Sequence, residues 1–305
     1  EVQRGVVMEE FKQRCLNQPY GDVGHLLRPL AYRVHPYQWP TIGKELSHIA
    51  NATLEEVKDF FFRFYAPNNA VLAVTGNISF EETVALTEKW FASIPKRDVP
   101  VRQLPQEPAQ TEERRLVVER NVPVDSLFMA YHMCERAHPD YYAFDILSDI
   151  LSNGKSSRLN RHLVQEKQLF SSIDAYISGT VDAGLFHISG KPAAGVSLEE
   201  AEAAVCEELN RLQNEAVAVQ ELEKVKNKFE STQIFGNINY LNVATNLAWF
   251  ELNGTAEDME KEVERYRSVT AGQLQAVAQT SFDKRNGVVL YYKGLSPAVS
   301  VREGV

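Results

Sequence analysis

The stretch Thr53-Leu54-Glu55-Glu56-Val57 leads to Tyr65, Asn69 and the pair Val71-Leu72, and this pattern occurs twice in the chain. The second copy reads Thr270-Ala271-Gly272-Gln273-Leu274 and leads to Phe282, Asn286 and the pair Val288-Val289. The offset between the copies is constant, because 270 − 53, 282 − 65 and 286 − 69 all equal 217. Each copy has the pattern of a capped amphipathic helix, a turn and a buried strand. Such self-similarity indicates two copies of one structural unit.

The second of these units is predicted to begin near Arg115. Subtracting the offset places the start of the first unit at 115 − 217 = −102. We therefore expect roughly a hundred residues, with whatever chemistry they carry, to precede Glu1 in the intact protein.

The composition is that of an ordinary globular protein. Of 305 residues, 44% are hydrophobic and 24% are charged, which fits about two domains. The net charge is −9 and no cluster of basic residues occurs, which argues against nucleic acid as the main partner. No run of 18 apolar residues is present, so no membrane span is expected. The chain starts without a signal peptide, and the cytoplasm and the periplasm both stay open as its compartment.

The cysteines are three and widely spaced, at Cys15, Cys134 and Cys206. Their spacing gives neither a disulfide framework nor a cysteine-rich metal site. We expect each to be a small buried apolar residue.

Hydrophobic periodicity predicts the elements of an α+β fold. Helices are expected over residues 1–17, 54–65, 79–94, 140–151, 157–166, 197–212, 219–234, 239–252, 257–266 and 270–280. Strands are expected over residues 70–75, 115–119, 126–132, 170–178, 183–189 and 287–292. Residues 18–50 are rich in proline and glycine and are expected to be mostly loop. The order of elements favours an antiparallel-rich sheet with helices packed on one face.

The histidines do not form a metal site by their spacing. They are His25, His35, His48, His132, His138, His162 and His187. No two lie three or four residues apart, and none belongs to an H-x-x-E-H or H-E-x-x-H motif. A lone histidine is more often structural than a ligand. The G-x-S-x-G elbow and the Walker-type loop are also missing, and residues 153–156 are interpreted as a helix-ending turn.

The first helix carries the residues that give a family resemblance. Glu9 and Glu10, taken alone, have the pattern of a solvated acidic pair. The stretch Val6-Val7-Met8-Glu9-Glu10, preceded by Gln3-Arg4, resembles the helix that donates the third zinc ligand in pitrilysin/insulinase-type zinc metallopeptidases. These inverzincins include the mitochondrial processing peptidases, and their other ligands come from an H-x-x-E-H motif about 75 residues earlier. The resemblance assigns zinc binding to Glu10, whereas the supporting acid of the family falls on Gln3.

Further motifs extend the resemblance over essentially the whole chain. His35-Pro36-Tyr37 with Thr41-Ile42-Gly43 is similar to the loop H-P-Y-x-x-P-x-I-G of the family. Residues 65–69 are similar to its strand entry Y-x-P-x-N. Residues 151–159, with the sequence LSNGKSSRL, are similar to its second-domain signature L-x-x-G-x-S-S-R-L.

The resemblance implies duplicated metallohydrolase-type domains, of which the first is truncated. Residues 1–97 would be the C-terminal part of the zinc-bearing peptidase domain, 98–114 a proline-rich linker, and 115–305 a second, homologous domain without metal ligands. The full-length protein would hold zinc through two upstream histidines and Glu10, and would cleave peptide bonds with a zinc-activated water. This chain would then be an incomplete and inactive fragment of a zinc endopeptidase.

The resemblance also implies a partner. An Arg and a Tyr in the second domain of the family clamp the substrate carbonyl, and they fall here on Val164 and Ser171. A homologous chain, in a homo- or heterodimer, would supply this pair, and the peptide substrate would add as a strand to a sheet edge. The alternative is a non-catalytic scaffold or partner subunit with the same fold. A generic binding module is less favoured because it does not explain the repeat.

Overall fold

The computed structural model describes residues 1–295. These residues form two compact units. Unit 1 comprises Glu1–Leu46, Pro105–Val219 and the described residues from Thr270 onward. Unit 2 comprises Ser47–Leu104 and Gln220–Val269. The domain boundaries expected from the sequence stay predictions.

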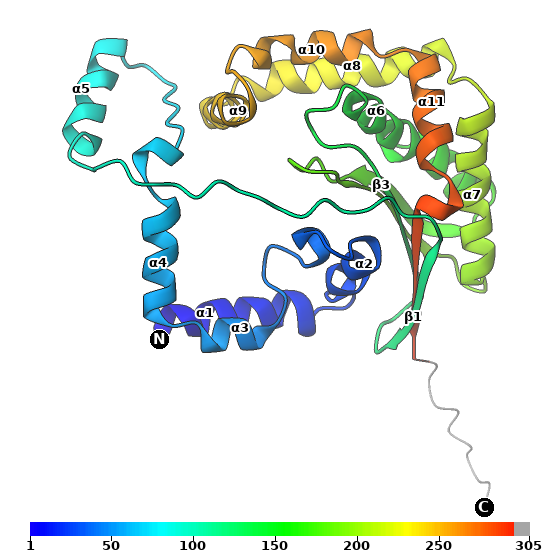
Figure 1. Cartoon of the computed structure of the whole chain (residues 1–305). Coiled ribbons are helices and arrows are strands. Elements are labelled where there is room, and N and C mark those ends of the chain that lie inside the picture. Colours follow the sequence, from blue (N-terminus) through cyan, green and yellow to red (C-terminus); the bar gives the residue numbers. More distant parts are fainter. Residues whose placement is uncertain (296–305) are drawn as a thin grey trace, which may run out of the picture. The chain divides into compact units, whose positions relative to one another are not determined.

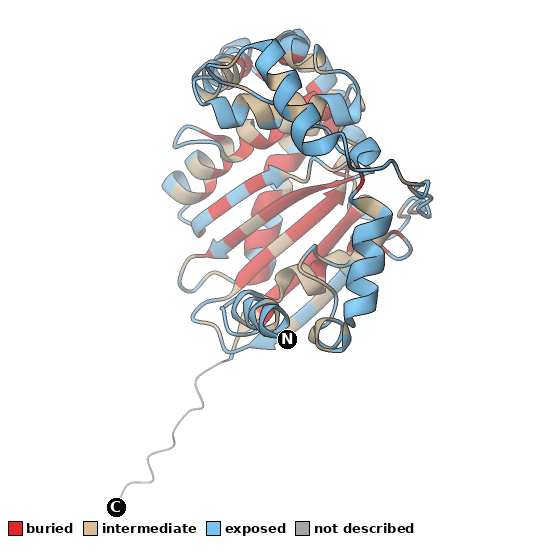
Figure 2. Ribbon diagram, turned by 90° about the vertical axis from the view of Figure 1, so that its left-hand side faces the viewer, coloured by how far each residue is buried: buried red, intermediate tan, exposed pale blue. Residues whose placement is uncertain are grey.

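A five-stranded mixed sheet forms the centre of unit 1. Its strands are β1 (Arg114–Arg120), β2 (Ser126–His132), β3 (Phe170–Ile177), β4 (Leu185–Pro192) and β5 (Gly287–Gly294). They lie in the order β1-β5-β2-β4-β3. Only β1 and β5 run parallel, and the other neighbours are antiparallel. The α+β class with an antiparallel-rich sheet is confirmed. The strands β2, β4 and β5 are mostly buried, as Figure 2 shows, whereas β1 and β3 at the two edges are more exposed.

The helices that come after β2 in unit 1 cover one face of this sheet. They are α6 (Tyr141–Ser152), η4 (Asn160–Glu166), α7 (Leu198–Asn214) and α11 (Ala271–Ser281). Alternate strand residues point to this side. Phe186 of β4, for example, lies 4.9 Å from Phe282 and 6.4 Å from Phe144 between ring centroids. This arrangement, visible in Figure 1, agrees with the predicted layer of helices on one face.

The other face of the sheet is covered by α2 (Val23–Ala31), which belongs to the N-terminal part of the chain. Leu27 and Ala31 pack there in one cluster with Ala130, Leu185, Val288, Leu290 and Tyr292. The sequence predicted loop over 18–50, so α2 and α3 (Leu46–Asn51) correct that expectation. Pro29 and Gly24 are weak helix formers, but burial of the apolar stripe of α2 outweighs their propensity.

The elements before and after α2 complete the N-terminal part of unit 1. Helix α1 (Val2–Phe11) continues into the π-helical turn η1 (Lys12–Leu16), as predicted for residues 1–17. Phe11 and Cys15 are the buried residues of this helix. A short 3-10 turn, η2 (Pro36–Gln38), comes after α2.

Two charged side chains hold α2 in place, one from the segment before β1 and one from the first residue of β1. The Glu107 carboxylate accepts backbone N–H groups of Arg33, Val34 and His35 at 2.9, 2.9 and 3.0 Å. Arg114 Nη1 donates to the carbonyl oxygens of Leu30 and Ala31, at 2.7 and 3.0 Å. The guanidinium therefore satisfies carbonyls at the C-terminus of α2, where a positive charge is favourable.

The repeat predicted from the sequence is present in the backbone. Helix α4 (Leu54–Phe64) and α11 both begin with a capping box, on Thr53 and Thr270 respectively. Each leads into a 3-10 turn, η3 (Pro67–Asn69) in the first copy and η5 (Lys284–Asn286) in the second. The Asn69 amide donates to Phe64 O at 2.8 Å, and the Asn286 amide donates to Ser281 O at 2.9 Å.

The two copies differ in the segment after the turn. Residues 287–294 form β5 inside the sheet, between β1 and β2, whereas residues 70–75, predicted as a buried strand, form no strand. Val71, Leu72 and Val74 are 38, 58 and 47% exposed. A strand requires neighbours that take up its backbone N–H and C=O groups, and the ladders of the described sheet do not include 70–75. The prediction of a buried strand here was therefore wrong for this structure.

Unit 2 is otherwise helical. Besides α3 and α4 it contains α5 (Phe80–Phe91), α8 (Val219–Gly236), α9 (Tyr240–Asn253) and α10 (Asp258–Ser268). Helices α8 and α10 pack through Phe229 and Tyr266, whose rings stack at 3.4 Å between centroids. Arg267 adds bonds to Glu230 and Asn227, and Lys226 Nζ donates to Arg267 O at 2.9 Å.

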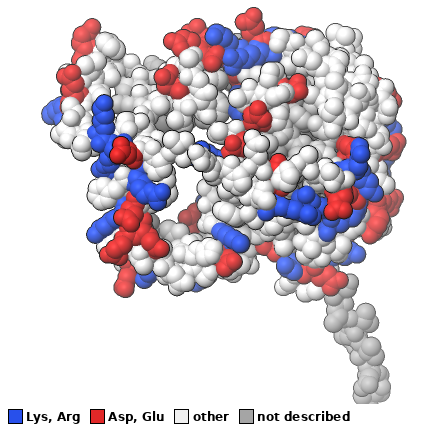
Figure 3. All heavy atoms as spheres, in the orientation of Figure 1, with Lys and Arg blue, Asp and Glu red and all other residues white. Residues whose placement is uncertain are grey.

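Three general properties of the described residues complete the fold. Cys15 is buried, whereas Cys134 and Cys206 are only partly buried, so the expectation of three buried cysteines holds fully for one. Among residues 1–295, none of the helices combines the length and apolar character needed to cross a bilayer. Figure 3 shows acidic and basic side chains interspersed on the visible face, despite the net charge of −9.

We predict that Glu107→Gln weakens the attachment of α2. Burial acts to raise the pKa of the Glu107 carboxyl, but its three backbone N–H donors outweigh burial and hold the pKa below the usual value. The carboxylate therefore stabilises the fold above about pH 4.3, and this contribution disappears as the pH falls through the lower folded pKa. We expect a loss of about 1 kcal/mol at pH 7 in urea unfolding, because the group is partly solvated. Glu112→Gln, at an exposed carboxylate, is the control, and equal effects of the two variants would contradict this assignment.

A second prediction concerns His187 on the α2 side of the sheet. Its ring stacks on Tyr176 at 4.8 Å, and its Nε2 lies 2.8 Å from Ser178 Oγ. Burial, assisted by the charge of Arg28, lowers the pKa of His187 to about 4. Because the unfolded chain binds this proton near pH 6.5, the unfolding free energy should fall by about 2 kcal/mol from pH 6.5 to pH 4.

Urea titrations at a series of pH values measure this effect. His187→Asn should reduce the slope between pH 6.5 and 4, although it lowers stability at neutral pH; the partly buried His132, whose pKa burial also lowers, should keep its own share of the slope. His138→Asn, at an exposed histidine, should retain the slope. An unchanged slope in His187→Asn would show that other groups cause the acid sensitivity.

Candidate functional site

Glu10 lies on the exposed side of α1. Its side chain is 47% exposed, and Oε1 lies 3.0 Å from Arg14 Nη2. The next residue, Phe11, is buried and contacts the His25 ring of α2 at 5.4 Å between centroids. The helix is therefore fixed on unit 1 through Phe11 and Cys15, and Glu10 stays accessible to a ligand.

Glu9 provides a natural comparison for Glu10. It is also exposed, and its Oε2 lies 3.5 Å from Lys12 Nζ. Glu9 and Glu10 thus carry the same charge, lie on the same helix and each have one basic partner. Only Glu10 falls on the ligand position that the family resemblance assigns.

The described residues do not by themselves fit a zinc ion. A zinc site needs three or four converging ligands. Residues 1–295 contain no group of three or more His, Cys, Asp or Glu side chains that could hold a metal. His25, the histidine closest in the chain to Glu10, has its Nε2 2.9 Å from Gly43 O. Zinc binding by Glu10 therefore stays a prediction.

The positions that would carry the substrate clamp have lost its chemistry. Val164 lies partly buried in η4, and its side chain donates no hydrogen bond. Ser171 lies where the register between β3 and β4 shifts, and its hydroxyl donates to Lys191 O at 3.1 Å. A short side chain that is already bonded to the neighbouring strand does not replace an extended phenol. The structure thus gives neither position a substrate-binding group.

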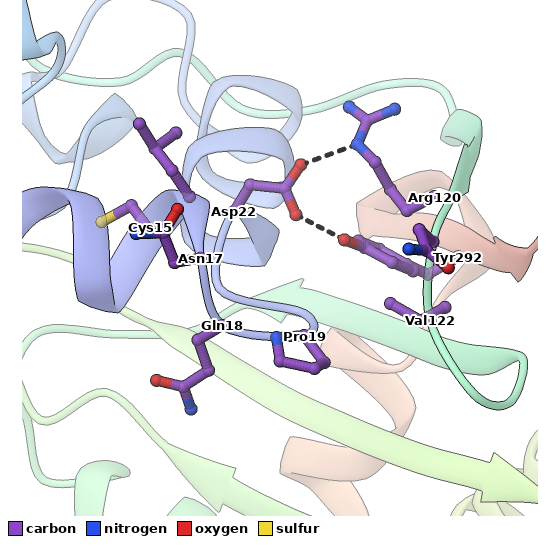
Figure 4. Close-up of a pocket in the computed structure, with 10 residues that line it drawn as sticks. Cys15, Asn17, Gln18, Pro19, Asp22, Arg120, Val122 and Tyr292 are labelled. Carbon is purple, nitrogen blue, oxygen red and sulfur yellow. Dashed lines mark hydrogen bonds and ion pairs between the residues drawn. The ribbon is translucent and has the colours of Figure 1, made fainter.

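Unit 1 also contains a pocket of about 560 Å³ that no sequence pattern predicts (Figure 4). Residues 15–19 and Asp22 form one side, and residues 120–122 and Tyr292 form the other. Asp22 joins the two sides, because its carboxylate accepts the Tyr292 hydroxyl at 2.7 Å and Arg120 Nε at 3.1 Å. These three residues are far apart in the chain, so no local motif signals them.

Asp22 affects the ionisation of its neighbour. Burial, together with the hydrogen bond and negative charge of Asp22, raises the pKa of the Tyr292 phenol. Tyr292 therefore remains a neutral donor at physiological pH. In the pocket wall the carboxylate of Asp22 pairs with the guanidinium of Arg120 through one of its three nitrogens, Nε.

Comparison with known proteins agrees with this architecture. A family model described as "Peptidase M16 inactive domain" matches residues 51–229. The zinc protease PqqE of Helicobacter pylori is 31% identical over 227 residues, which cover 73% of this chain and 51% of that protein. The uncharacterized zinc protease YmxG of Bacillus subtilis is 25% identical over 230 residues, covering 75% of this chain and 54% of that protein. The chain thus spans about half the length of these curated relatives.

Solved structures show the same fold. The crystal structure of a protease from Helicobacter pylori matches with a TM-score of 0.89 and 27% identity, over 95% of this chain and 71% of that one. A peptidase M16 inactive domain from Pseudomonas fluorescens matches with a TM-score of 0.84 and 20% identity, over 97% of this chain and 70% of that one. The second likeness is one of fold alone. Since the family model covers more than half of the chain, the protein belongs to the M16 peptidase family and carries its inactive domain.

Proposed function

We propose that this chain is part of a zinc-dependent endopeptidase in which Glu10 is one metal ligand. The observation that carries the proposal is the position of Glu10, accessible on a helix that unit 1 fixes through buried neighbours. Family membership supports it, as do the names of the relatives, several of which are zinc proteases.

The remaining ligands would come from residues other than those described, such as an H-x-x-E-H segment of a longer protein. The described residues supply one carboxylate, so no catalytic step is derived from them. Their part in the proposed enzyme is structural: the sheet and α2 hold the ligand helix and wall the space in which a peptide binds.

We also propose that a homologous chain supplies the substrate clamp. The support is the chemistry of Val164 and Ser171, neither of which offers the donor that clamps a carbonyl. A relative described as a probable mitochondrial-processing peptidase subunit beta, from Schizosaccharomyces pombe, is 25% identical over 173 residues. Its description as a subunit is consistent with a peptidase that divides its work between chains. A non-catalytic partner subunit is the alternative, and measurements of zinc content and peptide cleavage distinguish the two.

The first experiment measures zinc in residues 1–305 by mass spectrometry after dialysis against dilute zinc. We expect clearly less than one zinc per chain, because a single carboxylate binds zinc weakly. Glu10→Gln should leave the residual zinc content unchanged within error. One tightly bound zinc per chain would contradict the assignment of Glu10 as an isolated ligand position.

The second experiment uses the natural full-length product, alone and mixed with the homologous chain proposed to supply the clamp. We expect one zinc per chain and cleavage of an unstructured fluorogenic peptide that appears or rises strongly on mixing. Glu10→Gln should lower zinc affinity by at least about 100-fold and abolish cleavage, because loss of an outer-shell partner alone costs 10–100-fold.

Glu9→Gln is the matched control and should retain both zinc and activity. Absence of zinc and of cleavage in every mixture would contradict the proposal and favour the non-catalytic subunit.

A further inference from the structure

The pocket between residues 15–22 and 120–122 is a preformed cavity with unused polar groups. Its volume of about 560 Å³ lies within the usual range for ligand pockets. All of its lining residues belong to unit 1, so its shape does not depend on where unit 2 lies. It is separate from Glu10, Val164 and Ser171, and the proposed function assigns it no role.

The turn that forms one wall is tightly constrained. Tyr20 has a φ of 62°, in the left-handed region that few residues other than glycine adopt. At Gly21 an added Cβ would lie 2.3 Å from Arg14 O, so only glycine fits. The Tyr20 hydroxyl donates to Val124 O at 2.7 Å, which ties the turn to the segment after β1. Backbone strain that the surroundings hold in place is typical of functional sites.

Arg120 is held in one orientation on the facing wall. Its Nε donates to Asp22 Oδ2 at 3.1 Å, and its Nη1 donates to Glu119 O at 3.0 Å. Within the described residues its Nη2 has no partner, and the side chain is 45% exposed. Figure 4 shows the guanidinium beside Asp22 with its terminal nitrogens directed away from it. A fixed guanidinium with free N–H groups binds carboxylates in a bidentate manner.

Carboxamides line the same pocket as this guanidinium. Asn17, Gln18 and Asn121 line the pocket, and their side chains make no hydrogen bond within the part of the chain that the structure describes. A carboxamide both donates and accepts, so it matches the N–H and C=O of a peptide group. The negative charge of Asp22 is already compensated by Arg120 and the Tyr292 hydroxyl, which limits its repulsion of an incoming anion.

We propose that this pocket binds the C-terminal end of a peptide, with the terminal carboxylate on Arg120 and the last peptide groups on the carboxamides. The inference deepens the proposed function and rests on it, because hydrolysis of a peptide bond creates one new carboxylate at each cut. The ligand would be the N-terminal fragment released by cleavage, or a substrate held by its own C-terminus.

Peptide binding to residues 1–305 tests the proposal without zinc or turnover. The probe is an N-terminally fluorescein-labelled hexapeptide, AGSAGA, as the free acid and as the C-terminal carboxamide, followed by fluorescence anisotropy at low salt. We expect the free acid to bind at least tenfold more tightly than the carboxamide, and this preference to shrink at high salt.

Two pocket variants and one control separate the contribution of the guanidinium from that of the carboxamides. Arg120→Gln should abolish the preference for the acid, and Asn17→Ala/Asn121→Ala should weaken both peptides about equally. Arg63→Gln, at a surface arginine outside the pocket, should bind as the parent does. Circular dichroism melting identifies any variant that fails to fold. If Arg120→Gln does not fold, the double alanine variant still tests the pocket.

Competition identifies the source of the carboxylate. N-acetylalanine should displace the labelled peptide only at much higher concentration than unlabelled AGSAGA, since it lacks the preceding peptide groups. Equal binding of acid and carboxamide, or full binding by Arg120→Gln, would overturn the proposal. A full-length protein that cleaves peptides while this pocket shows no acid preference would refute the pocket and leave the proposed function intact. If instead the free acid binds preferentially to the pocket but the full-length protein holds no zinc and cleaves no peptide, the pocket is supported and the proposed function is refuted.

Discussion

The attachment of α2 to the sheet is the interaction on which unit 1 depends. The apolar stripe of α2 covers a sheet face that would otherwise expose Ala130, Leu185, Val288 and Leu290. Burial supplies the driving force, but a short helix with an internal proline needs its ends satisfied as well. Glu107 takes up backbone donors just beyond the helix, and Arg114 takes up its last carbonyls. Residues 107–114 thus hold α2 against the sheet through both of these side chains.

That attachment also places the features to which we assign function. Helix α1 reaches α2 through Phe11, and the turn at residues 17–22 leads directly into α2. Asp22, at the N-terminus of α2, contacts Arg120 at the end of β1 and Tyr292 in β5. The position of Glu10 and the shape of the pocket therefore depend on the same packing of α2 on the sheet.

The sequence predicted those elements whose stability is set locally or by a regular burial pattern. The limits of β2 were predicted to the residue, because its apolar run is bounded by clear turns. Capping boxes at Thr53 and Thr270 marked the starts of two helices correctly. Helix α2 was missed because proline and glycine give a loop signal that only tertiary burial overrides. The pocket could not be predicted, since Asp22, Arg120 and Tyr292 meet only after the sheet has formed.

The two copies of the repeat show how far a local pattern determines a structure. Their helices, 3-10 turns and asparagine bonds are the same, yet Val277 is 4% exposed and its counterpart Phe60 is 58% exposed. The second asparagine also donates to His132 O of β2 at 2.9 Å, a bond that requires a neighbouring strand. Residues 70–75 have the apolar composition of β5 but lack ladder partners among the described residues. Amphipathic helices and capped turns are therefore properties of the segment itself, whereas a β-strand is a property of the segment together with its neighbours.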